Sequence, residues 1–149
     1  MPDDDRLRLI ALDAEDLAVV STLAQDSVLR LPDINWFPSE GRFVMAMNRF
    51  AWEREQSGKS KGEHQRHRAA LYVARARRVR SIGIDRNAPG TVLNLLAVQF
   101  EPDDAPAGEV VLEFAGGATI RVAVECLEVQ LADLGPAWAT PHAPRHVLT

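Results

Sequence analysis

The feature that most constrains the fold is a stretch of alternating apolar and polar residues between positions 92 and 124. Val92–Phe100 has the length of a strand, and both Glu109–Phe114 and Ala118–Val124 place an apolar side chain at every second position. Because strand side chains point alternately to opposite faces, this pattern predicts strands that bury one face. Gly116 and Gly117 can adopt the positive φ angles of a tight hairpin turn. The stretch therefore predicts an antiparallel sheet.

After the third of these strands, the spacing of apolar residues changes from 2 to about 3.6, the period of a helix. The apolar positions at this spacing are Leu127, Leu131 and Leu134. Gly135 stands where a helix commonly ends, and Pro136 cannot continue one. We therefore expect a helix from Glu125 to Gly135 that caps the sheet. Asp133 would oppose the dipole of this helix, so we expect it to have a specific partner such as an arginine.

The N-terminal half adds one helix and several short strands. Asp13 can cap a helix, and Glu15 and Asp16 place negative charge in the first turn, where the helix dipole favours it. Apolar residues then recur at helical spacing, so we expect a helix over Ala14–Gln25. The segments of strand length around it are Leu7–Leu12, Val28–Leu31 and Ile34–Phe37.

Two longer segments have less regular patterns. Arg42–Trp52 is apolar at both odd and even positions, which predicts a strand covered on both faces for part of its length, with a helix as the competing interpretation. Ala69–Ile84 changes parity along its length, so a β-bulge near Arg77 and Arg78, or a break into two strands, is needed to keep its apolar side chains on one face. Between these segments, residues 53–67 are polar and predict a mobile loop.

These elements predict an α+β fold with a mainly antiparallel sheet of about seven strands. The sheet is either open or partly closed into a barrel, with an N-terminal helix and a C-terminal capping helix. The order of elements also resembles a pleckstrin-homology-like barrel, which is an analogy of fold alone. With 149 residues, 46% apolar and 26% charged, the chain has the composition of one globular domain over residues 1–149. We expect an ordered body over residues 6–138 and an irregular tail over 139–149.

Charge and cysteine content exclude several classes of protein. One cysteine, Cys126, permits neither an internal disulfide nor a cysteine-based zinc site. The acidic N-terminus differs from a signal peptide, and no apolar run reaches the ~20 residues of a membrane span, so we expect a cytoplasmic protein. The net charge is −4, but nine cations and two carboxylates between Lys59 and Arg86 make that segment +7, so the remainder carries −11.

Short motifs give no chemistry that withstands inspection. Residues 58–62 (GKSKG) match a nucleophile elbow formally, but no apolar strand precedes them and no helix follows. His64 and His67 are two imidazoles in a polar loop, whereas zinc sites need three or four ligands. We therefore predict no metal and no cofactor. If the protein is an enzyme, its site is assembled only in three dimensions, with Asp85, Arg86, His64 or His67 as candidates.

The arginine run on the segment 69–84 is the strongest candidate for a binding site. Its members are Arg75, Arg77, Arg78 and Arg80. One interpretation is a basic strand face that binds an acidic protein or another anion. The other is a solvated face whose arginine stems cover apolar surface. Only Tyr72 lies close enough to stack on a base, which makes a nucleic-acid partner a poor fit. We therefore expect a non-enzymatic interaction module; its oligomeric state is open, and a homodimer is compatible with the sequence.

Several segments together resemble a known family. They are LRLIALDAEDL, NRFAWE, GIDR with VLNLLAVQFEP, and VECLEVQLADLGPAW, which span Leu7 to Trp138. They are similar to an uncharacterised family of small alphaproteobacterial proteins that is catalogued as a domain of unknown function. The resemblance implies a bacterial cytoplasmic setting and a single domain, and it implies no activity, cofactor or catalytic residue.

Overall fold

The computed structural model describes residues 7–50 and 66–136, and the structural statements below concern those residues. They form one α-helix, ten strands and three 3-10 helices (η). In chain order these are β1 (Arg8–Ala11), α1 (Ala14–Ala24), β2 (Val28–Arg30), η1 (Leu31–Asp33), β3 (Ile34–Phe37), η2 (Pro38–Glu40), β4 (Arg42–Phe50), β5 (Arg66–Val73), β6 (Ala76–Ile82), β7 (Val92–Pro102), β8 (Gly108–Phe114), η3 (Ala115–Gly117), β9 (Thr119–Val124) and β10 (Val129–Pro136).

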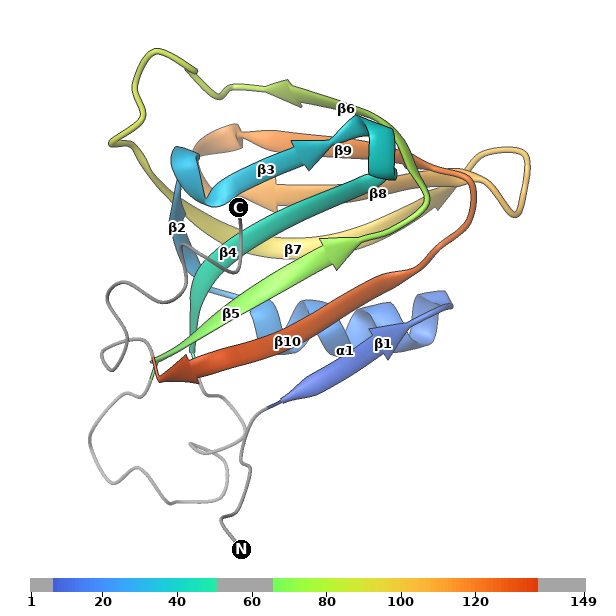
Figure 1. Cartoon of the computed structure of the whole chain (residues 1–149), viewed down its shortest axis with the longest axis horizontal. Coiled ribbons are helices and arrows are strands. Elements are labelled where there is room, and N and C mark those ends of the chain that lie inside the picture. Colours follow the sequence, from blue (N-terminus) through green and yellow to red (C-terminus); the bar gives the residue numbers. More distant parts are fainter. Residues whose placement is uncertain (1–6, 51–65, 137–149) are drawn as a thin grey trace, which may run out of the picture.

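The strands form one strongly curved antiparallel sheet (Figure 1). Hydrogen-bonded neighbours follow the order β1-β10-β5-β4-β2-β7-β8-β9-β6, and β3 pairs with the first half of β4. The path does not close, because β1 and β6 are its two ends. The expected α+β fold is therefore corrected to a mostly antiparallel β fold with a single helix in the described chain.

The segment 69–84 bends at Arg75, as its change of parity predicted. Arg75 has a φ of 58°, and this left-handed residue separates β5 from β6. The pairing of β6 with β9 also shifts register between Ala76 and Arg78. At the same corner, the Glu125 N–H donates to the carbonyl of Arg75 at 2.9 Å. The chain thus runs from β5 into β6, and from β9 into β10, around one shared corner.

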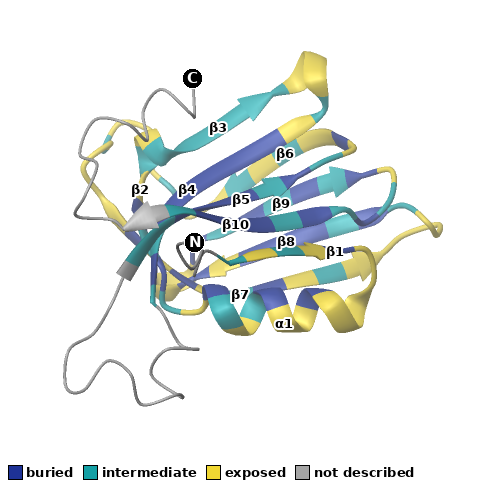
Figure 2. Ribbon diagram, turned by 60° about the horizontal axis from the view of Figure 1, so that its bottom comes forward, coloured by how far each residue is buried: buried dark blue, intermediate teal, exposed yellow. Residues whose placement is uncertain are grey.

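Most of the hydrophobic core lies inside this curved sheet (Figure 2). Phe43, Met45 and Met47 on β4 point into it and are fully buried. Val44 and Ala46, on the opposite face, are buried in a second cluster with Ala70. The prediction of a strand covered on both faces is therefore confirmed.

Helix α1 packs against the sheet from below in the view of Figure 1 and contacts chiefly β7. Asp13 caps it as predicted, because its Oδ1 accepts a hydrogen bond from the Asp16 N–H at 2.8 Å. Leu17, Val20 and Ala24 are its buried residues, and this apolar stripe adds its side chains to the core. The helix thus covers one side of the curved sheet and leaves other parts of its rim uncovered.

The predicted helix over Glu125–Gly135 is wrong, because this region contains strand β10. Its residues pair with β1 on one side and with β5 on the other, so the backbone groups of β10 find partners along both edges. Val129 and Leu131 point into the core at the strand period of two. Leu127 and Leu131 fit both periods, and the two flanking strands decide between them. The C-terminal cap on which the pleckstrin-homology-like barrel depended is therefore missing from the described residues.

Two further predictions fall mainly outside the described residues. The expected mobile loop, 53–67, overlaps them only at Arg66 and His67, which belong to β5 rather than to a loop. The expected irregular tail, 139–149, lies wholly outside them. Within the described ranges, no helix is long and apolar enough to cross a membrane.

Candidate functional site

The four arginines of the predicted basic face lie at or near β6, and two of them are paired with carboxylates. Arg75 Nε lies 3.4 Å from Glu128 Oε1. Arg80 Nη2 lies 3.1 Å from Glu109 Oε2, and Glu109 also accepts from Arg121 at 2.9 Å. Burial raises the pKa of the Glu109 carboxyl, but hydrogen bonds from Arg121 and Arg80 outweigh this and lower the pKa overall.

Arg77 and Arg78 are exposed and make no ion pair with a described residue. They border a polar hollow of about 530 Å³ between β6 and the loop that joins β7 to β8. The carboxylates in the lining of this hollow are Asp103, Asp104, Glu109 and Glu125. Negative charges therefore lie among the arginines of this run. Its role as a binding site for an anion stays a prediction.

A buried charge cluster joins four segments of the sheet. Arg49 on β4 donates through Nε and Nη2 to the two carboxylate oxygens of Asp133 on β10, at 2.8 and 3.0 Å. The Leu7 N–H donates to Asp133 Oδ2 at 3.0 Å, and His67 Nδ1 on β5 lies 3.2 Å from the same oxygen. The side chains of Arg49 and Asp133 have no exposed surface. Asp133 thus has the arginine partner that we expected, although its helix was wrong.

Strand parity explains why these side chains meet. Arg49 follows Met47 on the inner face of β4, His67 precedes Ala69 on the inner face of β5, and Asp133 follows Leu131 on β10. Burial raises the pKa of the Asp133 carboxyl, but hydrogen bonds from Arg49 and from the Leu7 N–H, with the Arg49 charge, lower it overall. A charge pair that is mutually satisfied in this way anchors strands and has little capacity left for a ligand.

The residues considered for an enzyme are not brought together. His67 contacts Asp133 in the buried charge cluster, whereas Asp85 and Arg86 lie in the loop that joins β6 to β7. His64 lies outside the described residues. In the described ranges, no group of three or more His, Cys, Asp or Glu side chains could hold a metal ion.

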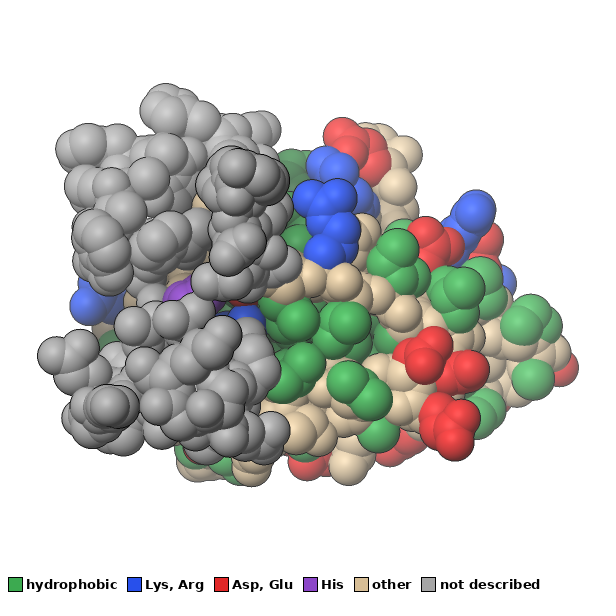
Figure 3. Space-filling view, turned by 90° about the horizontal axis from the view of Figure 1, so that it is seen from below, with side chains coloured by type: hydrophobic (Ala, Val, Ile, Leu, Met, Phe, Trp, Pro, Cys, Tyr) green, Lys and Arg blue, Asp and Glu red, His purple; other side chains and the backbone are tan. Residues whose placement is uncertain are grey.

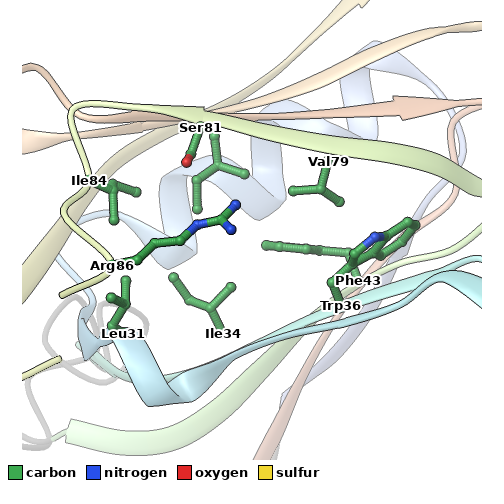
Figure 4. Close-up of a pocket in the computed structure, with 9 residues that line it drawn as sticks. Leu31, Ile34, Trp36, Phe43, Val79, Ser81, Ile84 and Arg86 are labelled. Carbon is green, nitrogen blue, oxygen red and sulfur yellow. The ribbon is translucent and has the colours of Figure 1, made fainter.

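The sheet has a second feature that the sequence did not indicate, an apolar slot between β3 and β6 (Figure 4). Its volume is about 420 Å³. The residues that line it are Leu31, Ile34, Trp36, Phe43, Val79, Ser81, Ile84, Arg86 and Ile120. Phe43 and Ile120 are buried core residues, so the slot reaches from solvent to the hydrophobic core.

Local structure explains how distant residues reach the slot. Ile34 and Trp36 are two positions apart on β3 and so share one face of the strand. Val79 and Ser81 do the same on β6, after the register shift. Gly83 then turns the chain with a φ of 78°, where a side chain would be strained and would crowd the backbone of Ala118. The loop that follows adds Ile84 and the exposed Arg86 to the lining.

Among the described residues that line the slot, Arg86 is the only titratable group. Its side chain reaches inward from the loop, with the guanidinium between the side chains of β3 and those of β6 (Figure 4). It makes no hydrogen bond or ion pair with any described residue. No motif indicated this site, because its residues come from four parts of the chain and most resemble ordinary core positions.

The face that carries α1 offers a weaker candidate. Ile10, Leu12 and Val19 are apolar and more than half exposed there. Figure 3 views the molecule from this side and shows carboxylates among the hydrophobic side chains. Exposed apolar residues that are interrupted by charge are common on protein surfaces, so the enclosed slot is the better candidate site.

Comparison with the curated proteins and with the solved structures found no match. A family model described as a protein of unknown function, DUF2948, matches residues 7–146, which is nearly the whole chain. The predicted resemblance to a domain of unknown function is therefore confirmed, and the chain belongs to the DUF2948 family.

Proposed function

We propose that this protein is a non-enzymatic binding module that holds a small apolar molecule in the slot between β3 and β6. The observation that carries this proposal is the slot itself: about 420 Å³ of space with seven apolar residues, Ser81 and Arg86 in its lining. Small-molecule sites are typically ~300–1,000 Å³ in volume, mostly apolar, and furnished with a few polar groups.

The lining favours binding over catalysis. A guanidinium keeps its proton in proteins, and the Ser81 hydroxyl has no general base beside it in the lining. General acid–base catalysis needs a group that exchanges its proton near neutral pH. The described lining supplies none, which supports the non-enzymatic interpretation. The single cysteine is compatible with the expected cytoplasmic location.

The test is binding of N-phenyl-1-naphthylamine, an uncharged dye that fluoresces strongly in apolar sites. Val79→Trp would fill the slot, so we expect it to weaken dye binding by more than about tenfold. Ile82→Trp is the matched control, because Ile82 lies on the same strand and is 65% exposed outside the slot. Equal loss of binding in both variants, or no binding by the unmodified protein, would contradict the proposal.

A second candidate retains the predicted site at Arg75, Arg77, Arg78 and Arg80, with an acidic protein or another anion as its partner. The observation in its favour is that Arg77 and Arg78 are adjacent, exposed and without a carboxylate partner among the described residues. We expect retention on a polyglutamate resin at low salt, lost in Arg77→Gln/Arg78→Gln and kept in Arg8→Gln/Arg30→Gln. Equal retention of the two double variants would count against this candidate.

A further inference from the structure

We infer that the slot selects amphipathic anions, and that Arg86 is the residue that holds the anionic group. This inference rests on the proposed binding function and names its ligand class. The slot sets one permanently charged guanidinium against mostly apolar walls, and among the described lining residues the other polar side-chain groups are the Ser81 hydroxyl and the Trp36 indole N–H. Arg86 is exposed and makes no ion pair with a described residue, so a ligand that places a negative charge beside it gains a charge-assisted hydrogen bond.

Two carboxylates that lie close to slot residues along the chain, Asp85 and Asp33, are already engaged. Asp85 accepts a hydrogen bond from the Asn87 N–H at 2.9 Å, which shapes the loop. Asp33, on η1 beside the slot residue Leu31, accepts from Arg68 Nη2 at 2.9 Å and from the Arg30 N–H at 2.9 Å. Neither carboxylate bonds to Arg86, so the guanidinium keeps its donors for a ligand.

The shape of the slot specifies the rest of the ligand. At roughly 30 Å³ for each position, as for a water molecule in the liquid, a volume of about 420 Å³ holds on the order of ten to fifteen non-hydrogen atoms. A larger molecule, such as the dye, would bind with part of its structure outside the open end of the slot. The apolar walls of β3 and β6 suit a hydrocarbon or aromatic body. The planar fork of Arg86 suits a carboxylate, which can accept two parallel hydrogen bonds. A medium-length carboxylate with an apolar chain therefore combines both requirements.

The test compares three competitors for the slot: decanoate, decan-1-ol and acetate, each displacing N-phenyl-1-naphthylamine. Decanoate and decan-1-ol share their chain length and differ in charge, whereas acetate has the charge and no apolar body. We expect decanoate to displace the dye at about tenfold lower concentration than decan-1-ol, because a charge-assisted hydrogen bond adds affinity. Acetate should not displace the dye. In Arg86→Gln the preference for decanoate should fall to about twofold or less, whereas Arg8→Gln, an exposed arginine on β1, should keep it.

The outcomes separate this inference from the function on which it rests. If the dye binds and Val79→Trp abolishes that binding, but decanoate and decan-1-ol compete equally, the slot binds ligands without selecting anions. A preference that persists in Arg86→Gln would also overturn the inference, as would failure of both chain compounds to displace the dye. If the dye does not bind at all, the proposed function itself is wrong.

Discussion

Arg49 and Arg86 carry the same guanidinium group, but Arg49 is buried whereas Arg86 is exposed beside an apolar slot, and their partners differ. Arg49 is fully buried and bonds to both oxygens of Asp133, which in turn accepts from the backbone of Leu7. Arg86 lies at an open slot and bonds to no described residue. The first arginine has its charge satisfied within the fold, whereas the charge of the second is available to a ligand. The presence or absence of a partner within the fold therefore says more about the role of each arginine than the apolar residues around it.

The largest expected effect comes from breaking the buried pair. Arg49→Met leaves the Asp133 carboxylate without its main partner in a buried site, so we expect a loss of about 3–5 kcal/mol in the free energy of unfolding. Chemical denaturation measures it. Arg42→Met is the matched control, because Arg42 pairs with Glu40 at the surface, and it should cost less than about 1 kcal/mol. Equal losses of unfolding free energy in Arg49→Met and Arg42→Met would contradict the expected difference between the buried and the exposed ion pair.

Removing both charges should recover part of this loss. In Arg49→Met/Asp133→Leu no uncompensated buried charge remains, so we expect this double variant to be more stable than Arg49→Met alone by about 1–3 kcal/mol. Denaturant titration of both single variants and the double variant completes the cycle. If the double variant is as unstable as the sum of the single losses, the two side chains do not act as a pair.

Acidification should expose the same pair. The pKa of Asp133 in the folded protein is lowered, below the value of about 3.9 of an unperturbed aspartate. Between the lowered pKa of the folded protein and the ordinary pKa of the unfolded chain, the unfolded chain therefore binds more protons. The stabilisation from Asp133 is complete above pH ~4 and is lost as the pH falls through the pKa of the folded protein. Arg49→Met/Asp133→Leu should lose less stability than the unmodified protein between pH 5 and 2.5. Parallel pH profiles would contradict the assignment.

The smallest expected effect on stability belongs to Arg86. Because it bonds to no described residue, Arg86→Gln should change the free energy of unfolding by less than about 0.5 kcal/mol, although it is expected to remove the preference for anions. Thermal and chemical denaturation at equal protein concentration provide the comparison. A loss as large as that of Arg49→Met would show that Arg86 is structural and that the two arginines do not differ in role.

The sequence predicted elements best where a local signal marked them, such as a cap residue, a change of parity or a glycine pair. The Asp13 cap, the break in the segment 69–84 and the positive φ angles of Gly116 and Gly117 are all present in the structure. The residues from Glu125 onward were misassigned because Leu127 and Leu131 suit either period, and only pairing with β1 and β5 selects the strand. Pairing across the sheet is long-range information that local spacing does not contain.

The candidate site was harder to predict than the fold. Ile34 and Trp36 lie on β3, Val79 and Ser81 on β6, and each pair fits an ordinary strand with one buried face. The slot exists because the path of strands stops at β6 without closing, which no single segment encodes. The sequence indicated Arg86 only as one of four candidate residues for an enzyme whose site could not be defined. The density of cations in the sequence indicated instead the arginine run from Arg75 to Arg80. Two of its four guanidinium groups are paired with nearby carboxylates.

The most direct test of the slot uses the five isoleucines of the chain as reporters. Ile34, Ile84 and Ile120 line the slot, whereas Ile10 and Ile82 are exposed and lie outside its lining. The measurement is the NMR shift of the isoleucine δ1-methyl groups during a titration with decanoate. If the slot binds its ligand as proposed, the three lining methyl groups shift together with one dissociation constant, and those of Ile10 and Ile82 stay in place. Shifts confined to Ile10 and Ile82, or no saturable shift at the three lining positions, would contradict the proposed site.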